Sequence, residues 1–521
     1  MPRNRLPLLL WLASAPLIFS LIFASAVERS QEARVLETAR EMIGQGWENW
    51  LIPHCNGQVR LRKPPLAYWA AAASFKIFGV HDWTGRIPFA LASWLLLAAT
   101  YAACRPIIGQ RGALLASAGL AGTCFFIRFG RYAETDILAA LFVTTAIAGI
   151  IHGALAGRSW VKTLCYLAAG VSIGLVVMSK GPPAIFPVPF LIGFAWILGR
   201  WQILSRFLLS GAFLAAVAVA LPWWLYVSRL PEFKIVAREI TAVTMGLDHP
   251  GPPWFYFLVS LLATAPWCAF VVLGITQAIR RCRRDLRARI ILLWIACIIV
   301  PMSLVVKKQD HYMLSLLPPF MAVAGWAIDQ GFRARPNMVR WNLITFAATA
   351  IGGIVASAIP IFDARQTRKS LIPADFVLAA SILIAGSLLF IAIQRSRRQM
   401  LPLRTILSAF AVGSILMVIA IGHWRPSLEP ITYPDVARQI QGEFGHRELV
   451  LYDAENLPIC FYLGRTLPYY ETRVELLNAL SRRPNLAIIW EQQEKFDLPP
   501  PGIEKRRIPM RKRDIVIFEQ K

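Results

Sequence analysis

Two carboxylates in this chain have the chemistry to activate or orient a nucleophile, and both lie beside apolar runs. Glu32 belongs to the charged segment that follows the apolar N-terminal run, and it precedes an amphipathic stretch. Asp136 opens the apolar run 137–156, where a helix N-terminus also favours an acid. Glu37 and Glu41 are expected on the solvated face of the amphipathic stretch. Glu32 and Asp136 are therefore the predicted catalytic pair, facing one cavity on the same side of a membrane.

A group of cations lies at the ends of apolar runs, on the side of the membrane where the charge pattern described below disfavours them. They are Lys63, Lys180, Lys307, Lys308 and His311. Cations on that side indicate an anionic ligand such as a lipid phosphate, and Tyr312 adds a hydroxyl donor. Carboxylates and cations together suit transfer from a lipid-linked phosphate, because the cations stabilise the departing phosphate while a carboxylate activates or orients the acceptor.

The elements that must position these residues are membrane helices. The 521 residues are 56% hydrophobic and 16% charged, whereas soluble domains are about 25% charged. The net charge of +25 fits basic loops beside anionic lipid, so we predict no nucleic-acid partner. A span needs about 20 apolar residues, which predicts roughly thirteen spans. They are expected near 6–27 (uncleaved), 87–104, 112–128, 137–156, 161–179, 182–199, 205–227, 254–279, 289–306, 312–330, 341–362, 374–394 and 403–422.

Arginine and lysine set the predicted orientation, with the N-terminus in the cytoplasm and the protein in the cytoplasmic (inner) membrane. The arginine-rich run 280–289 then lies inside. The loop 28–86 and everything after residue 422 lie outside. We expect two surface helices in that outer loop, one around 35–43 with apolar residues at helical spacing and one over 66–79.

The composition changes after residue 422, where short β runs at 449–453, 486–491 and 514–518 alternate with helical segments. This predicts a transmembrane domain over 1–422 and an extracytoplasmic α/β domain over 423–521. Cys55 and Cys460 fall on the same side, but two cysteines without informative spacing do not predict a disulfide. The carboxylates have the chemistry to hold a divalent metal ion, although no ligand spacing requires one, so no cofactor is assigned.

The segment EARVLETAREM…W…LIPH..G..RLRKPPLAYW resembles the first loop of membrane glycosyltransferases of the ArnT and protein mannosyltransferase type. GRIPFAL, YAETDILAALF, KGPPAIFPV, HPGPPWFYF and KKQDHYMLSLLPPF follow in the order found in that family. The resemblance covers roughly residues 5–330. It implies a polytopic α-helical GT-C fold with a terminal α/β domain. It also implies a polyprenyl-phosphate sugar as donor and inversion at the anomeric carbon.

Carried over to this chain, the resemblance implies that Lys63 and Asp136 line the active site. It further implies that the donor's lipid phosphate binds at the KKQDHY motif, through Lys307, Lys308, His311 and Tyr312. Arg62 stands before Lys63 where the family commonly has an acid, which makes the predicted pocket more cationic.

The first loop departs from the family at its start. The family begins this loop Asp-Glu-x-Arg, with a catalytically important Asp, whereas this chain has Gln31, Glu32, Ala33 and Arg34. An amide cannot act as a base or a charged ligand. Either Glu32 or Glu28 supplies the carboxylate, or the activity of this member is altered.

The predicted function is a membrane glycosyltransferase that moves a sugar from a polyprenyl-phosphate donor to a lipid (lipid A-like), glycan or protein acceptor on the outer face of the membrane. Two alternatives remain. A transporter or flippase of lipid-linked sugars would need ionisable residues near mid-membrane, whereas the polar residues here gather on one side. A non-catalytic scaffold with the same fold is the other, because of Gln31.

Overall fold

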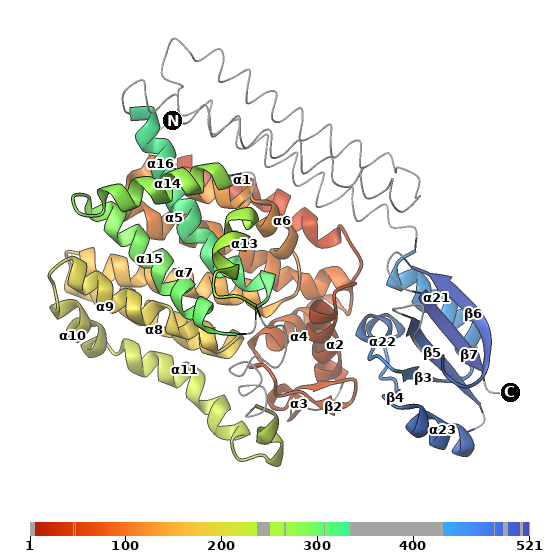
Figure 1. Cartoon of the computed structure of the whole chain (residues 1–521). Helices are drawn as coiled ribbons and strands as arrows, with labels where there is room; N and C mark the ends of the chain where they lie inside the picture. Colours follow the sequence, from red (N-terminus) through yellow and green to blue (C-terminus); the bar gives the residue numbers. More distant parts are fainter. Residues whose placement is uncertain are drawn as a thin grey trace, which may run out of the picture. The chain divides into compact units, whose positions relative to one another are not determined.

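The structure is a computed structural model whose described residues fall in two compact units (Figure 1). It describes residues 6–44, 46, 48–236, 251–264, 267–306, 308–333, 431–483, 485–492, 499–510 and 514–519. The first unit comprises 1–22, 61–67 and 88–425, and the second comprises 23–60, 68–87 and 426–521. The predicted domain boundary at 422 and 423 and the predicted spans 341–362, 374–394 and 403–422 lie outside the described residues.

The first unit is helical. Its elements are α1 (Leu6–Ser20), η1 (Leu21–Phe23), α5 (Asp82–Ala121), α6 (Cys124–Phe129), α7 (Thr135–Leu155), α8 (Ser159–Ser179), η2 (Pro182–Ile185), α9 (Pro187–Ile197), α10 (Gln202–Leu209), α11 (Ala212–Val227), η3 (Pro231–Phe233), α13 (Phe255–Ala263), α14 (Cys268–Arg281), α15 (Leu286–Leu304), η4 (Asp310–Leu316) and α16 (Leu317–Arg333). The start of α5, residues 82–87, belongs to the second unit. Among the described residues, five helices are long and apolar enough to cross a membrane, or six if the bent pair α10 and α11 is one span. These helices confirm the prediction of a helical membrane protein with several spans.

Several predicted spans differ in detail, and backbone chemistry explains where they break. Helix α5 covers the predicted span 87–104 and the first part of 112–128, which continues as α6. It is kinked at Gly109, whose φ of 78° is a conformation that favours glycine. The predicted span 205–227 is two helices bent by 50°, with Gly211 at φ 81° between them. The predicted span 182–199 begins as η2, where adjacent prolines open the turn. Likewise 254–279 is two helices, α13 and α14.

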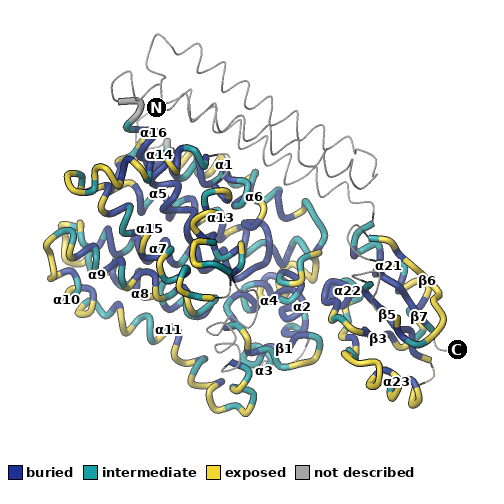
Figure 2. The backbone as a smooth tube through the Cα atoms, viewed as in Figure 1, coloured by how far each residue is buried: buried dark blue, intermediate teal, exposed yellow. Residues whose placement is uncertain are grey.

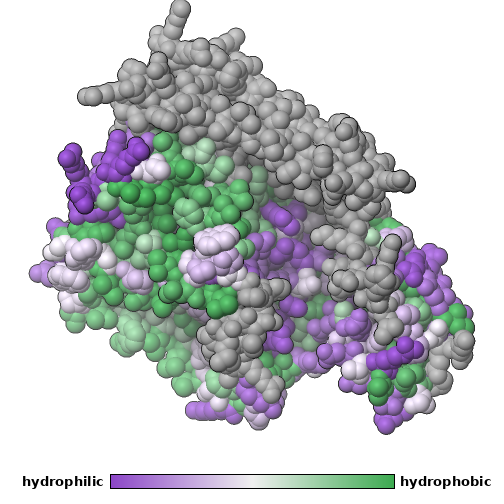
Figure 3. Space-filling model, in the orientation of Figure 1, coloured by the Kyte–Doolittle hydropathy of each residue, from purple (hydrophilic) through white to green (hydrophobic). Residues whose placement is uncertain are grey.

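Burial in this unit matches a membrane-embedded bundle. Helix α7 is buried along most of its length (Figure 2) and packs against α8 and η4. The visible face of the helical unit is broadly apolar (Figure 3). Large apolar side chains on α9, α10 and α11, such as Trp196, Leu209 and Leu214, are exposed. Such a surface is costly in water and favourable in lipid.

The second unit contains the first loop, with α2 (Ser30–Gly44), α3 (Glu48–Leu51), α4 (Leu66–Phe78) and the hairpin of β1 (His54–Cys55) and β2 (Gln58–Val59). The two predicted loop helices are therefore present as α2 and α4. Asn56 and Gly57 take φ of 52° and 75° at the hairpin turn, a geometry that favours Asn-Gly. The expectation that Glu37 and Glu41 face solvent is wrong, because both carboxylates are buried.

The rest of this unit is a five-stranded α/β structure. Its elements are α21 (Tyr433–Phe444), β3 (Glu448–Tyr452), α22 (Leu457–Leu463), β4 (Tyr469–Tyr470), α23 (Arg473–Arg482), β5 (Leu486–Gln492), β6 (Ile503–Pro509) and β7 (Asp514–Glu519). The strand order is β4-β3-β5-β7-β6, with β3 parallel to β4 and β5, and β7 antiparallel to β5 and β6. The three predicted β runs are β3, β5 and β7. The short β4 and the polar β6 are additional.

Alternating side chains of this sheet bury two apolar faces. Leu449 and Leu451 pack with α21 and α22 on one face, whereas Val450 and Tyr452 pack with α23 on the other. The sheet is thus the middle of three layers. Cys55 and Cys460 are free thiols, as are the six other cysteines.

Candidate functional site

Asp136 is the centre of a charged cluster in the first unit. It lies in the first turn of α7, is 3% exposed, and forms an ion pair with the ammonium of Lys180. The helix dipole adds a positive field at this end of α7. His311 Nε2 lies 4.0 Å from the other carboxylate oxygen, Oδ2. Three predicted site residues from separate motifs are therefore brought together around one buried anion.

Lys63 reaches the same helix end through Thr135. The Lys63 ammonium donates to Thr135 Oγ1 at 3.4 Å, and the Thr135 hydroxyl donates to Asp136 Oδ2 at 3.4 Å. Thr135 was missed by the sequence analysis, although it stands next to Asp136 in the YAETD motif. The threonine hydroxyl links the cation to the carboxylate, because it accepts a hydrogen bond from Lys63 and donates one to Asp136.

His311 and Tyr312 lie on η4 and complete the cluster. The His311 ring Nδ1 donates to Asp310 Oδ1 over 3.2 Å, which leaves Nε2 as the acceptor in the neutral tautomer. Among the described residues, buried Nε2 has no hydrogen-bond partner. The Lys180 ammonium lies 3.4 Å from the centroid of the Tyr312 ring, a cation–π contact. The cluster therefore places cationic and neutral donors around Asp136.

Lys180 is presented by a sharp chain reversal after α8. Gly181 takes φ 85° and donates its N–H to Val176 O at 3.2 Å, which ends the helix. Burial lowers the pKa of Lys180 to about 8, and the positive charge of Lys63 acts in the same direction while Asp136 opposes it. Lys180 is thus a cation whose charge is lost near neutral pH more readily than that of an ordinary lysine.

Lys308 has a different set of partners. Its ammonium donates to Met302 O and Ser303 O at 2.9 Å each and also to Val305 O, which caps the C-terminal end of α15. A Cβ added to Gly251 would lie 2.5 Å from Lys308 Cγ, so the glycine allows this close approach. Helix carbonyls therefore take all three ammonium protons of Lys308.

Tyr256 supports the KKQDHY loop and was also missed by the sequence analysis. Its hydroxyl accepts from Gln309 N at 3.2 Å, and its ring centroid lies 4.9 Å from the Lys308 ammonium. The HPGPPWFYF motif that contains Tyr256 was the available signal. Of the other predicted residues in this unit, Arg62 is exposed, and Lys307 lies outside the described residues.

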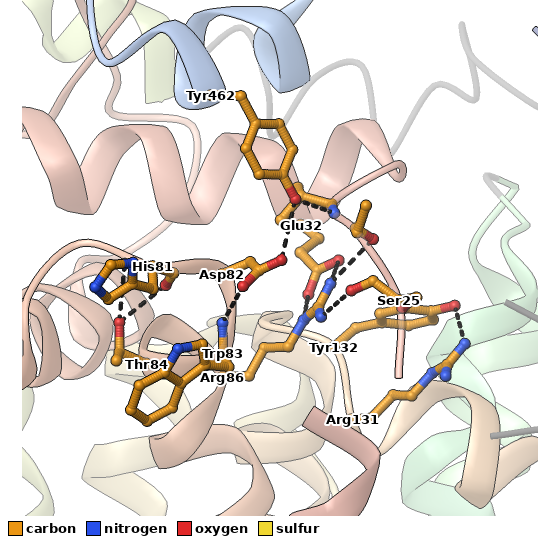
Figure 4. A network of polar contacts seen from close by, with 12 residues as sticks. Ser25, Glu32, His81, Asp82, Trp83, Thr84, Arg86, Arg131, Tyr132 and Tyr462 are labelled. Carbon is orange, nitrogen blue, oxygen red and sulfur yellow. Dashed lines mark hydrogen bonds and ion pairs between the residues drawn. The ribbon is translucent and has the colours of Figure 1, made fainter. Parts of the chain in front are cut away.

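Glu32 lies in the second unit, in a buried ion pair with Arg86 (Figure 4). Arg86 Nε and one terminal nitrogen donate to the two oxygens of Glu32 at 2.7 and 2.9 Å. Arg86 also donates to the carbonyls of Ser25 and Ala26. The exposed fractions of the Arg86 and Glu32 side chains are 1% and 0%. Glu32 and Asp136 thus belong to different units.

The neighbouring carboxylates of α2 have partners as well. Glu37 pairs with Arg40 at 2.6 Å, and Glu41 accepts from Asn56 N and Gly57 N at 2.5 and 3.0 Å. Burial raises the pKa of both carboxyls. Within the described ranges, no group of three or more His, Cys, Asp and Glu side chains is arranged to hold a metal ion.

Comparison with known proteins identifies similar chains. Residues 62–226 match the family model described as dolichyl-phosphate-mannose-protein mannosyltransferase. The chain is 28% identical over 66% of its length to undecaprenyl phosphate-alpha-4-amino-4-deoxy-L-arabinose arabinosyl transferase 2 of Sodalis glossinidius. It is 26% identical over 74% of its length to a transferase of the same description from Pseudomonas fluorescens, of which it covers 70%. The chain spans 64% of the length of the Sodalis relative.

Two solved structures share the fold. ArnT from Cupriavidus metallidurans, bound to undecaprenyl phosphate, gives a TM-score of 0.78 at 19% identity and 98% coverage of both chains. The archaeal oligosaccharyltransferase AglB from Archaeoglobus fulgidus gives 0.51 at 12% identity, with 93% of this chain and 69% of that chain covered. The resemblance stated from the motifs is confirmed.

Proposed function

We propose that this chain, an ArnT-like protein with the GT-C fold, transfers a sugar from a polyprenyl-phosphate donor to an acceptor at the membrane. One observation carries the proposal. Asp136, Lys180, Lys63 with Thr135, and His311 converge at the start of α7 from four distant parts of the chain. A buried acid with two lysine ammonium groups close by is suited to a reaction that creates a phosphate anion.

The cluster suggests a role for each side chain. The acceptor oxygen attacks the anomeric carbon, the bond from that carbon to the phosphate oxygen breaks, and polyprenyl phosphate leaves with the electron pair. Lys63, Lys180 and Tyr312 bind the phosphate, whose charge grows in the transition state. His311 remains a predicted ligand of the donor phosphate, a role that requires a proton on Nε2, which lies 4.0 Å from Asp136 Oδ2. Asp136 takes the acceptor proton or holds the acceptor in line.

In this proposal, Glu32 and Lys308 stabilise the local structure and take no part in the chemistry. The ion pair with Arg86 favours a positioning role for Glu32 over the catalytic role predicted from the sequence. The carbonyl partners of Lys308 favour a role in shaping the loop that presents His311 and Tyr312. Arg62, which is exposed, and Lys307 remain predicted ligands of the donor phosphate.

The membrane arrangement proposed here follows the charge pattern of the loops. The N-terminus lies in the cytoplasm, the chain makes about thirteen spans, and the domain after residue 422 lies outside the cytoplasmic membrane. The Asp136 cluster would then face the outer side. The acceptor is a lipid, glycan or protein. A phosphate acceptor needs no strong base, whereas a hydroxyl acceptor does.

Transfer of a radiolabelled sugar tests the proposed function. The full-length protein in lipid nanodiscs is given polyprenyl-phosphate-linked aminoarabinose or hexose, with lipid A, glycan and peptide acceptors in separate reactions. We expect labelled product with one acceptor class and release of polyprenyl phosphate. The same protein is also reconstituted in closed lipid vesicles, where movement of the donor across the membrane without any product would overturn the proposal in favour of a flippase. Neither product nor movement would favour a scaffold.

The pH dependence of donor use tests the phosphate-binding role of Lys180. Because its pKa is about 8, kcat/KM for the donor should fall as the pH rises through that value and the ammonium loses its charge. Lys180→Arg should remove this fall in kcat/KM, the alkaline limb of the pH profile, because a guanidinium keeps its charge. The measurement is kcat/KM from pH 6 to 10 in both proteins.

Lys162→Arg is the matched control, since it makes the same change at the start of α8. Its alkaline limb should equal that of the wild type. An unchanged limb in Lys180→Arg would contradict the assignment.

A further inference from the structure

The segment between α1 and α2 is held from two sides in the second unit. Arg86, at the start of α5, donates to the carbonyls of Ser25 and Ala26. The N–H of Val27 donates to the hydroxyl of Tyr462 at 2.7 Å, and that hydroxyl donates to Asp82 Oδ2 at 3.2 Å (Figure 4). Tyr462 lies on α22, so a residue of the C-terminal α/β layer completes the hydrogen bonding of the first loop.

The same part of the C-terminal region holds the far end of the loop. The Asn56 side chain donates to Leu467 O at 2.8 Å and accepts from Leu467 N at 2.8 Å. Asn56 is the first residue of the left-handed hairpin turn, and Glu41 fixes that turn through its backbone N–H groups. The hairpin runs directly into the RLRKPP segment that carries Lys63.

We propose that Tyr462 is a positioning residue of the transfer reaction, whose hydroxyl fixes the entry of the first loop against Asp82 and so sets the placement of α2. The inference rests on the proposed glycosyltransferase function. Tyr462 touches no reacting atom in this proposal. It acts through Val27 and Asp82, next to the Glu32–Arg86 pair.

Apolar contacts that do not involve the Tyr462 hydroxyl hold α22 in place. The hydroxyl therefore affects the position of the loop entry more than the docking of α22. The rings of Phe75 and Phe461 stack with centroids 6.2 Å apart, and Ile459, Cys460 and Phe461 of α22 are buried. These contacts remain when only the Tyr462 oxygen is removed. The burial also raises the pKa of the Tyr462 phenol, so the hydroxyl stays protonated and donates to Asp82 at any working pH.

Tyr462→Phe in the full-length protein tests the proposal, with Tyr469→Phe as matched control. The Tyr469 hydroxyl donates to Asp453 O at 3.0 Å, a tyrosine hydrogen bond that lies wholly within the C-terminal α/β region. We expect Tyr462→Phe to lower kcat about five- to tenfold, since one hydrogen bond shifts a loop population by that order. The donor KM and Tm should stay near those of the control. Hydrogen exchange at the Val27 amide should speed up in Tyr462→Phe alone.

A double variant tests whether Tyr462 and Asp82 act on transfer through the same hydrogen bond. Asp82→Asn combined with Tyr462→Phe should lower kcat no further than Tyr462→Phe alone, because both changes break one link. Unchanged Val27 exchange, or a kcat within twofold of the control in a folded and active protein, would overturn the proposal. An inactive wild type would instead count against the proposed function, and the exchange measurement would still decide whether Tyr462 holds the loop.

Discussion

Asp136→Asn is expected to lower kcat by about 10²- to 10⁴-fold, the range associated with a positioned acid or base. The change keeps the shape of the side chain but removes the charge that pairs with Lys180 and faces His311. It also leaves the Lys180 ammonium without its counter-charge, so some loss of stability accompanies the loss of transfer. The measurements are single-turnover transfer and thermal unfolding of the same preparation.

A second variant separates the two effects. Asp136→Asn with Lys180→Met removes both charges, so thermal stability should recover toward that of the wild type while transfer stays lost. Recovery of transfer together with stability would mean that Asp136 only neutralises Lys180, and it would contradict the catalytic role.

Glu32→Gln is expected to lower the free energy of unfolding by about 3–5 kcal/mol, the usual result of removing one partner from a buried ion pair. Water does not screen this ion pair, because the Glu32 and Arg86 side chains are 0% and 1% exposed. The folded fraction should retain transfer within about tenfold of the wild type, as a positioning role implies. Chemical unfolding and activity per folded molecule are the measurements.

Glu37→Gln is the matched control on the same helix. Its partner Arg40 is 16% exposed, so water can hydrate the guanidinium when the pair is broken and the loss should be smaller. A folded Glu32→Gln protein whose transfer falls by the factor expected for Asp136→Asn would restore Glu32 to the catalytic pair that the sequence predicts.

The sequence was informative where chemistry and position coincide. Asp136, Lys180 and His311 each stand at the end of an apolar run, and helix ends of the same bundle meet. This expectation uses only the positions of the three residues in the sequence and not the packing of the helices. The predicted spans 161–179 and 182–199 also implied a chain reversal at Lys180.

Partners of buried charges were not predictable in the same way. Periodicity identified the polar face of α2 but not what covers it, so Glu37 and Glu41 were expected in solvent although a hairpin and Arg40 pack there. Lys308 was recognised as a cation, but only the structure shows the end of α15 beside it. Arg86 stands in the GRIPFAL motif, yet nothing local connects that motif with Glu32.

The hydrogen bond from Val27 to Tyr462 joins residues 435 positions apart in the chain. At a synthesis rate of about 5–20 residues per second, Val27 is added to the chain roughly 20–90 s before its partner. During that interval the ion pair of Glu32 with Arg86 can form, but the contacts of the first loop with α22 cannot. The final fold of the loop is therefore a late event in biogenesis, and nascent chains that end before residue 431 lack the surface against which this loop closes.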